Sequence, residues 1–154
     1  MNERREGRGD YKQNAAKIFL GQYRGLLQQY ETYRELIAQA EERATDTAAK
    51  LSNVRVHSGR VSDTVAEAAA QAVDTVGLMM DAAARARTRL EEIMRAVESV
   101  PEEMQKAVLL KRYIAGESWQ EICSEIGYEK TRVFELHGWG LAAVNKWMKK
   151  EQEQ

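Results

Sequence analysis

The fold is decided first by residues 16–44, AKIFLGQYRGLLQQYETYRELIAQAEERA. Apolar residues return along this stretch at alternating steps of three and four, which is the heptad spacing of a helix that packs along another helix. We therefore expect a helix from about Tyr11 to Ala49, with extra leucines that widen its apolar stripe toward more than one neighbour. The heptad positions are Ala16, Phe19, Tyr23, Leu26, Tyr30, Tyr33, Ile37, Ala40 and Ala44, and the extra leucines are Leu20, Leu27 and Leu36.

A second heptad pattern follows Asp63, which suits the start of a helix because its carboxylate accepts hydrogen bonds from free backbone amides. Each of the two helices should contain about 35–40 residues and be roughly 50–60 Å long, since an α-helix rises 1.5 Å per residue. Equal lengths joined by a short segment predict an antiparallel helical hairpin, a coiled coil over residues 11–100. The second pattern runs through Val65, Ala69, Ala72, Val76, Met79, Ala83, Ala86, Leu90, Ile93, Val97 and Val100.

The connection between these helices, residues 50–62, contains Ser, Asn and Gly residues that favour turns, so we expect a loop at the tip. It carries Lys50, Arg55, His57 and Arg60, with no acidic residue before Asp63. This charge suits contact with phosphate or with a partner protein, whereas a solvated loop is the simpler interpretation. The sequence leaves both open.

A two-helix hairpin buries little surface for its length, so it needs a further partner. We expect either a second copy of the chain, giving a homodimer through the hairpin, or the chain's own C-terminal helices. Tyr23, Tyr30 and Tyr33 stand at heptad spacing, which favours core positions over a ligand site. Residues 1–10 are polar and contain glycine, and are expected to form a disordered N-terminus.

The composition of the 154-residue chain favours an all-α protein. Hydrophobic residues make up 44% and charged residues 31%, and a single proline leaves room for long helices. Cys123 is the one cysteine, and His57 and His137 are far apart in sequence, so neither a disulfide nor a metal site is expected. No apolar run approaches the ~20 residues that span a bilayer and no signal peptide is visible, so we expect a cytoplasmic protein without membrane contact.

The sequence offers no pattern typical of catalysis. It has no Gly-rich phosphate loop after a strand, no H-E-x-x-H and no G-x-S-x-G. The acidic pair Glu102 and Glu103 points to different parts of a helix surface and is interpreted as solvated charge. We therefore expect neither an enzyme nor a bound cofactor.

A shorter helix is expected after Pro101, since proline is tolerated in a first helical turn. Ser99 and Glu102 have the spacing of a capping box for its start. Gly116 is well suited to end it, because glycine adopts the left-handed conformation that follows many helices.

Two more helices are expected beyond that glycine. Ser118 and Glu121 form a second capping-box pattern, opening a short helix that Gly127 should end in a left-handed turn. A last helix should run over residues 129–149. Its inward-facing residues are expected to be Val133, Leu136, Leu141 and Val144.

Residues 119–136 look like a helix-turn-helix. Cys123 takes the position that must be small because the two helices nearly touch, and Gly127 takes the turn. The apolar positions of the motif are filled by Ile122, Ile126, Tyr128, Val133 and Leu136.

Over residues 101–144, PEEMQKAVLLKRYIAGESWQEICSEIGYEKTRVFELHGWGLAAV, the chain resembles region four of bacterial sigma factors. It is most similar to the region-four-like proteins of phages and prophages, the RinA/ArpU-like late-gene regulators and their relatives, some of which carry an N-terminal helical hairpin. The resemblance implies a helix-turn-helix DNA-binding domain over residues 101–150. It also implies a sequence-specific transcriptional regulator of phage type, with double-stranded DNA and RNA polymerase as partners in a bacterial host cell.

By that resemblance, the helix after Gly127 would enter the major groove. Lys130 and Arg132 would contact phosphate or guanine, Glu135 would accept a bond from cytosine N4, and Phe134 would touch a thymine methyl. The DNA-binding residues so implied are Lys130, Thr131, Arg132, Phe134, Glu135, His137 and Lys146.

Several nearby side chains have two interpretations. His137 suits either a backbone phosphate or a partly buried place held by a neighbour. Trp119 suits the DNA backbone, although such a residue more often staples its helix to the core. Trp139 and Trp147 share a helix face that would pack on the hairpin or form an interface, and Cys123 is interpreted as a small apolar core residue.

The charge of the chain favours DNA locally and not overall. The formal net charge is −1, yet five basic residues and one acidic residue lie between Lys130 and Lys150. Glu135 and Trp139 on the presumed reading helix keep open a helical adaptor that contacts RNA polymerase or another protein. A third possibility is a DNA-recognition subunit in phage packaging, which would assemble as a ring.

Overall fold

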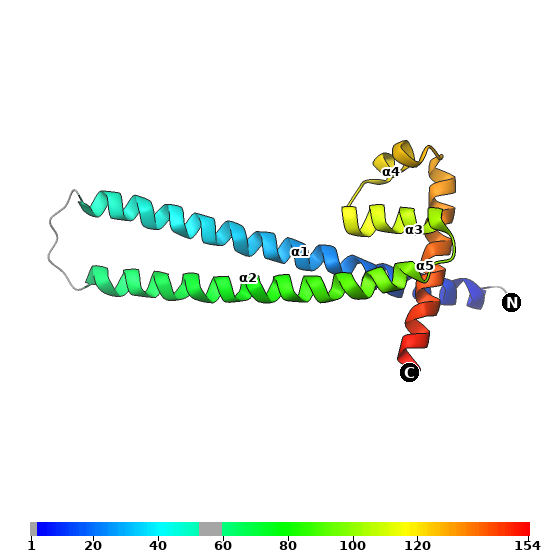
Figure 1. Ribbon diagram of the computed structural model, residues 1–154, viewed down its shortest axis with the longest axis horizontal. Coiled ribbons are helices and arrows are strands. Elements are labelled where there is room, and N and C mark those ends of the chain that lie inside the picture. The colour runs from blue at the N-terminus through cyan, green and yellow to red at the C-terminus, as the bar shows by residue number, and fades with distance from the viewer. Residues whose placement is uncertain (1–2, 53–59) are drawn as a thin grey trace. The chain divides into compact units, whose positions relative to one another are not determined.

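The computed structural model describes residues 3–52 and 60–154 as helices and short connections, with no strand in those ranges (Figure 1). The expected all-α class is therefore confirmed. The elements are α1 (Glu3–Ser52), α2 (Arg60–Glu98), α3 (Glu103–Leu109), the π-helical η1 (Leu110–Ala115), α4 (Trp119–Ile126) and α5 (Lys130–Gln152). The chain divides into two compact units, a core unit (Met1–Gly25 with Ala86–Gln154) and an arm unit (Leu26–Arg85).

The long helices extend further than their sequence patterns. The structure starts α1 at Glu3, inside the segment 1–10 that was expected to be disordered, because no proline or capping signal delays the helix. Helix α2 starts at Arg60, so Asp63 lies within its first turn and is not the N-cap. The tip loop expected over residues 50–62 is thereby shortened at both ends, and residues 53–59, with their basic side chains, lie outside the described ranges.

The first hydrophobic cluster of the core unit joins the start of α1 and the end of α2 to the C-terminal helices. Leu20, Ile93 and Leu141 are fully buried in it, and the indole of Trp147 packs 6.0 Å from the Phe19 ring. The expected packing of the heptad helices against the C-terminal helices is thus confirmed for this part of α1 and α2. The buried members are Ala16, Phe19, Leu20, Ile93, Ala96, Val97, Val100, Leu109, Leu141 and Val144.

A second, smaller cluster holds α4 and α5 against α3. It comprises Val108, Ile122, Val133 and Leu136, with Trp119, Cys123 and Ile126 packed around it. The expected inward residues of the last helix are therefore buried. Cys123, which was expected in the core, is half-buried at the edge of this cluster. Of the residues in the described ranges, no helix combines the length and apolarity needed to cross a bilayer.

Helices α3 and α5 approach closely at Gly140. A Cβ atom at this glycine would lie 3.0 Å from Leu109 Cδ1 and 3.2 Å from its Cγ. Both Gly140 and Leu109 are buried, so glycine allows the two helices to pack at a distance that a larger residue would increase.

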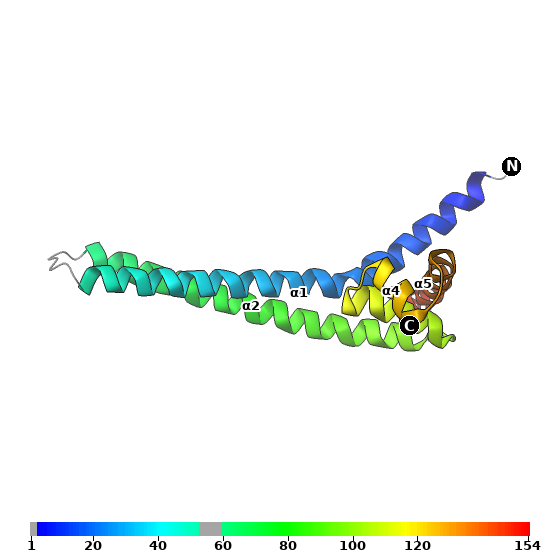
Figure 2. The same ribbon diagram turned by 90° about the horizontal axis from the view of Figure 1, so that it is seen from above.

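In the arm unit, the two long helices run alongside each other in opposite directions (Figures 1 and 2). Tyr30, Tyr33 and Ile37 of α1 are half-buried, as are Ala72 and Met79 of α2. The tyrosines therefore take packing positions, which agrees with their heptad spacing.

The covered face of α2 in the arm unit differs from the expected heptad at alternate positions. Ala82 is fully buried while Ala83 is exposed, and Thr75 is more covered than Val76. Neighbouring positions of a helix lie 100° apart, and alanines on both sides of the true seam made the two registers hard to distinguish by pattern.

Candidate nucleic-acid interface

The local sequence explains where α4 begins and ends. Ser118 Oγ accepts a hydrogen bond from the Glu121 backbone N–H at 3.2 Å, and Glu121 Oε2 accepts one from the Ser118 N–H at 2.6 Å. This is the capping box expected from the sequence. Hydrogen bonding of the Glu121 carboxylate to Ser118, first to its backbone N–H and then to its side chain, lowers the pKa of Glu121. Gly127 follows with φ of 75°, the left-handed conformation expected at the end of α4.

The start of α3 differs from the capping box that the sequence predicted for it. Glu102 is the N-cap of α3 and makes no side-chain capping bond. Ser99 Oγ instead donates to the Ala96 carbonyl oxygen at 2.6 Å and so belongs to the end of α2. The predicted Ser99–Glu102 capping box is therefore wrong, whereas the predicted stop at Gly116 is confirmed by its φ of 76°.

The outer face of α5 presents a straight row of exposed residues. They follow steps of three and four and so share one side of the helix: Arg132, Glu135, Trp139, Ala142 and Lys146. Thr131 lies beside this row, also exposed. The structure thus brings four of the expected DNA-binding residues, Thr131, Arg132, Glu135 and Lys146, to one accessible surface.

Arg132 is held by its own helix. Its Nη1 donates to Glu135 Oε2 at 3.0 Å, and its guanidinium lies 5.0 Å from the centre of the Trp139 ring. A guanidinium carries five N–H donors, so this arrangement orients the group and leaves donors for a further acceptor. The same contact offsets part of its charge.

Phe134 and Lys130 lie at the edge of this surface. The Phe134 ring is 40% exposed and meets the Trp119 ring edge to face, with centroids 4.8 Å apart. The Lys130 ammonium lies 5.6 Å from the Phe134 centroid. Trp119 is half-buried between α4 and α5, so its interpretation as a staple is the one the structure supports.

His137 lies inside the core unit and not on the exposed face of α5. Its side chain is buried, its Nε2 is 2.9 Å from Tyr113 Oη, and its ring packs against Tyr113 and Trp119. Of the two interpretations of this histidine, the structure supports the buried one, and His137 is withdrawn from the candidate DNA-contacting residues. Burial lowers the pKa of His137 to about 4, assisted by the charges of Lys17 and Arg112.

Arg112, which the sequence did not single out, braces the entry to α4. Its Nη1 donates to the Glu117 carbonyl oxygen at 2.9 Å, and its guanidinium lies 4.7 Å from the Trp119 ring centre. Burial raises the pKa of the neighbouring Tyr113, so this phenol keeps its proton and can donate it to His137. No local pattern indicated these contacts, because their partners are separated along the chain.

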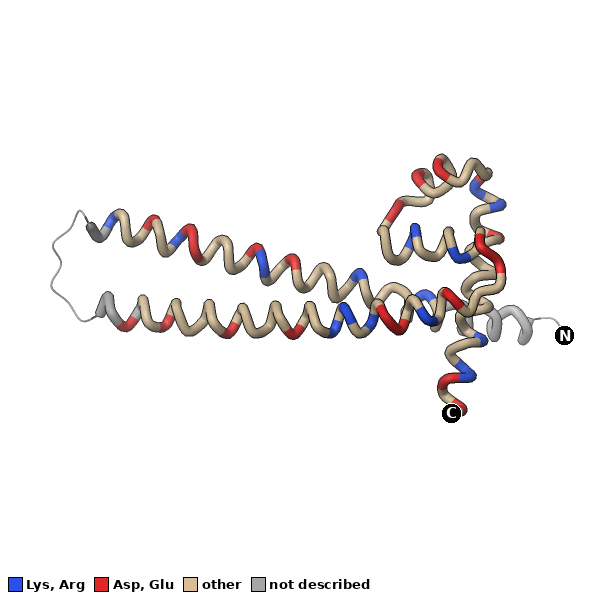
Figure 3. The backbone as a smooth tube through the Cα atoms, viewed as in Figure 1, with Lys and Arg blue, Asp and Glu red and all other residues tan. Residues whose placement is uncertain are grey.

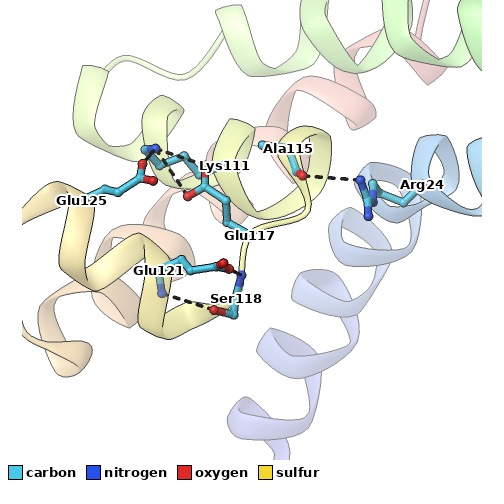
Figure 4. A network of polar contacts seen from close by, with 7 residues as sticks. All are labelled: Arg24, Lys111, Ala115, Glu117, Ser118, Glu121 and Glu125. Atoms are coloured by element: carbon cyan, nitrogen blue, oxygen red, sulfur yellow. Dashed lines mark hydrogen bonds and ion pairs between the residues drawn. The ribbon is translucent and has the colours of Figure 1, made fainter.

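A polar network connects η1 to α4 and α1 (Figure 4). The Lys111 ammonium forms ion pairs with Glu117, at 3.2 Å, and with Glu125. Hydrogen bonding to Glu125 raises the pKa of Lys111. Arg24 of α1 reaches the Ala115 carbonyl oxygen at 3.5 Å, beside Gly116.

Gly116 is favoured here because of its positive φ of 76°, which other residues rarely adopt. A Cβ atom would also lie 2.3 Å from the Arg24 guanidinium carbon, so the flexible end of Arg24 would have to move aside. The left-handed Gly116 lies where η1 ends, and the Ser118–Glu121 capping box lies where α4 begins.

Charge is unevenly distributed along the chain (Figure 3). The first turns of α5 carry Lys130 and Arg132, and its end carries Lys146, Lys149 and Lys150. Helix α4 contributes acidic residues instead, including Glu121 and Glu125. A polyanion would therefore meet attraction on α5 and repulsion on α4.

Comparison of the chain with protein-family models, with curated proteins and with solved structures gives no match.

Proposed function

We propose that the chain is a sequence-specific DNA-binding transcriptional regulator of phage type, resembling region four of sigma factors. In this proposal α4 and α5 act as a helix-turn-helix, and the outer face of α5 enters the major groove of double-stranded DNA. The protein acts in the cytoplasm of a bacterial host by binding and not by catalysis.

The observation that carries the proposal is the state of Arg132. It is exposed in the first turn of α5 and oriented by Glu135 and Trp139, with N–H donors left for a further acceptor. A planar guanidinium with a fixed direction suits the O6 and N7 acceptors of guanine, which lie side by side in the major groove.

The other basic residues of α5 suit a positioning role. Lys146 lies 14 residues beyond Arg132, about 21 Å along the helix axis. That distance exceeds the ~12 Å width of the major groove, so a helix whose early turns lie in the groove would carry Lys146 toward a phosphate strand. Phosphate contacts of this kind add affinity without sequence preference.

The test is binding of Arg132→Ala to sequences selected from random DNA by the wild type. Loss of one guanine contact should cost about 1–3 kcal/mol, roughly 5- to 150-fold in affinity, and relax preference at one base pair. Arg87→Ala is the matched control, because Arg87 is also exposed and paired with a glutamate, Glu91, at 3.3 Å on α2.

Circular dichroism should show equal helicity in the wild type and both variants. Unchanged affinity and preference in Arg132→Ala would remove Arg132 from the recognition surface. Equal losses in Arg132→Ala and Arg87→Ala would show a general charge effect and would contradict the assignment of α5 as the reading helix.

A helical adaptor that contacts RNA polymerase or another protein is the second candidate. It is favoured by Trp139, whose side chain is 50% exposed in the middle of the outer face of α5. Exposed tryptophans are common anchors of protein interfaces. Capture of purified RNA polymerase by the wild type but not by Trp139→Ala, with no DNA shift at low salt, would support the adaptor.

A further inference from the structure

A row of apolar residues on α2 is exposed in the arm unit. Val73 is 71% exposed, Met80 64% and Val76 36%. Together with exposed alanines they repeat at alternating steps of three and four, which is again heptad spacing. We call this row the α2 outer seam; it comprises Ala66, Ala69, Val73, Val76, Met80 and Ala83.

The outer seam is distinct from the face that α2 turns toward α1. That covered face includes Ala72, Met79 and Ala82, which are half-buried or buried. The outer seam begins about 100° further round the helix, because Val73 and Met80 each follow a covered residue by one position. The apolar arc of α2 is therefore wider than the face that α1 covers.

The space outside the seam is open. A Cβ atom at Gly77, which borders the seam, would meet no atom within 4 Å. The seam extends over 18 residues, from Ala66 to Ala83, which is a rise of about 26 Å. Because the seam residues are exposed, a second helix of ordinary length can lie along them.

The charges on α2 limit which kind of partner can pack on the outer seam. Between residues 61 and 84 the sequence has no lysine or arginine, and its acidic residues are Asp63, Glu67, Asp74 and Asp81 (Figure 3). An acidic helix repels nucleic acid and anionic lipid surfaces, so neither is a candidate.

The positions that flank a heptad seam select its partner through their charges. With the seam at positions a and d, Glu67, Asp74 and Asp81 all fall at position b, away from a partner. The flanking e and g positions between residues 65 and 84 are all uncharged: Val65, Ala70, Ala72, Gly77, Met79 and Ala84. A partner helix with charged flanks would leave those charges unmatched, whereas an identical helix brings an equally uncharged pair of flanks.

We propose that the α2 outer seam packs against the same seam of a second copy of the chain, giving a homodimer with α2 at its centre. The two covered faces continue to hold α1 in each copy, and the two acidic edges point away from the contact. This inference is independent of DNA binding, because none of the seam residues belongs to α5.

The test is the mass of the full chain in solution, measured by light scattering over a range of concentrations. The wild type should have twice the 17.5 kDa mass of one chain. Met80→Lys should weaken the association at least tenfold, and Val73→Lys combined with Met80→Lys should give the single-chain mass. Both residues are already exposed, so helicity by circular dichroism should not change.

Leu78→Lys is the matched control. Leu78 is 51% exposed on the same helix, two residues from Met80, but lies on the acidic side and away from the seam. It should keep the dimeric mass. A single-chain or ring-sized mass for the wild type, an unchanged mass for the double variant, or equal weakening by Leu78→Lys would each overturn the proposal.

Discussion

At the scale of single residues, Arg132 is both oriented by its neighbours and partly offset in charge. Glu135 lies one turn away on the same face and accepts one of its N–H groups. If the outer face of α5 reads DNA, the glutamate performs two opposing tasks. It aligns Arg132, and it places a negative charge near the phosphates.

Replacing Glu135 separates these tasks. Glu135→Gln keeps the side-chain length and removes the charge, so affinity for non-specific DNA should rise by about 1 kcal/mol, roughly fivefold. Preference for the selected site should fall because Arg132 is held less firmly. Fluorescence anisotropy with selected and scrambled duplexes measures both quantities, and equal changes on the two duplexes would contradict the aligning role.

The burial of His137 makes the free energy of unfolding depend on pH, because burial lowers the pKa of this histidine. The folded protein keeps His137 neutral until the pH falls to about 4, whereas the unfolded chain protonates it near its usual value of 6.5. Between these values the unfolded state binds more protons, so stability falls as the pH decreases through this window. Above it the histidine contributes no pH dependence.

We expect His137→Gln to reduce this pH dependence. Urea unfolding at pH 7, 5.5 and 4.5 should show a wild-type loss that approaches 3 kcal/mol in order of magnitude and a smaller loss in the variant. His57→Gln, which alters the other histidine, serves as the control. The same pH profile in His137→Gln and wild type would show that another group is responsible.

At the scale of helices, signals that act over one turn were read correctly from the sequence. The Ser118–Glu121 capping box and the left-handed glycines at 116 and 127 depend on residues at most four apart. The Ser99–Glu102 pattern had the same spacing but failed, because Ser99 closes α2 and Glu102 itself caps α3. Where two helices adjoin, a local pattern does not show whether a residue ends the first helix or begins the second.

Contacts between distant segments were not predictable in this way. His137 follows Val133 by one turn, which places both on the inner side of α5, but its partner Tyr113 stands 24 residues away. Helical periodicity predicted the exposed face of α5 in outline, but it did not predict the contacts of Arg112 or the Lys111 network. On α2, the expected heptad and the covered face differ by one position at alternate sites, such as Ala83 and Ala82. The sequence of α2 alone does not distinguish the two, because this depends on where α1 packs.

Alanine substitutions at two glycines of α5 would show how tightly α5 packs against α3. A Cβ atom at Gly138 would meet nothing within 4 Å, so Gly138→Ala should stabilise the protein by up to about 1 kcal/mol through helix propensity. Gly140→Ala gains the same propensity but presses on Leu109, which is fully buried and has little room to move. It should therefore be no more stable than the wild type.

Urea unfolding of both variants at pH 7 measures this difference. The pair is matched because the glycines are two residues apart in one helix. Equal stabilisation by both substitutions would show that Leu109 yields and that the α3–α5 contact is not tightly packed.

At the scale of the whole molecule, the net charge of −1 conceals a strong separation of charge. Residues 130–150 include five basic residues and one acidic residue. By contrast, all the charged residues of α2 between positions 61 and 84 are acidic. Long-range attraction of the entire protein to a polyanion is consequently weak. Binding to DNA would depend on short-range contacts of α5.

This separation makes salt the most informative variable for the proposed function. Each phosphate contact lowers the slope of log affinity against log salt by about 0.9, so contacts from α5 should give a slope of roughly −3 to −5. Lys146→Ala should make the slope shallower by about one and weaken selected and scrambled duplexes equally, because a phosphate contact carries no sequence preference. Arg132→Ala should change preference as well, and this contrast distinguishes a reading residue from a positioning one. A slope near zero in the wild type would contradict DNA as the ligand of α5 and favour the adaptor.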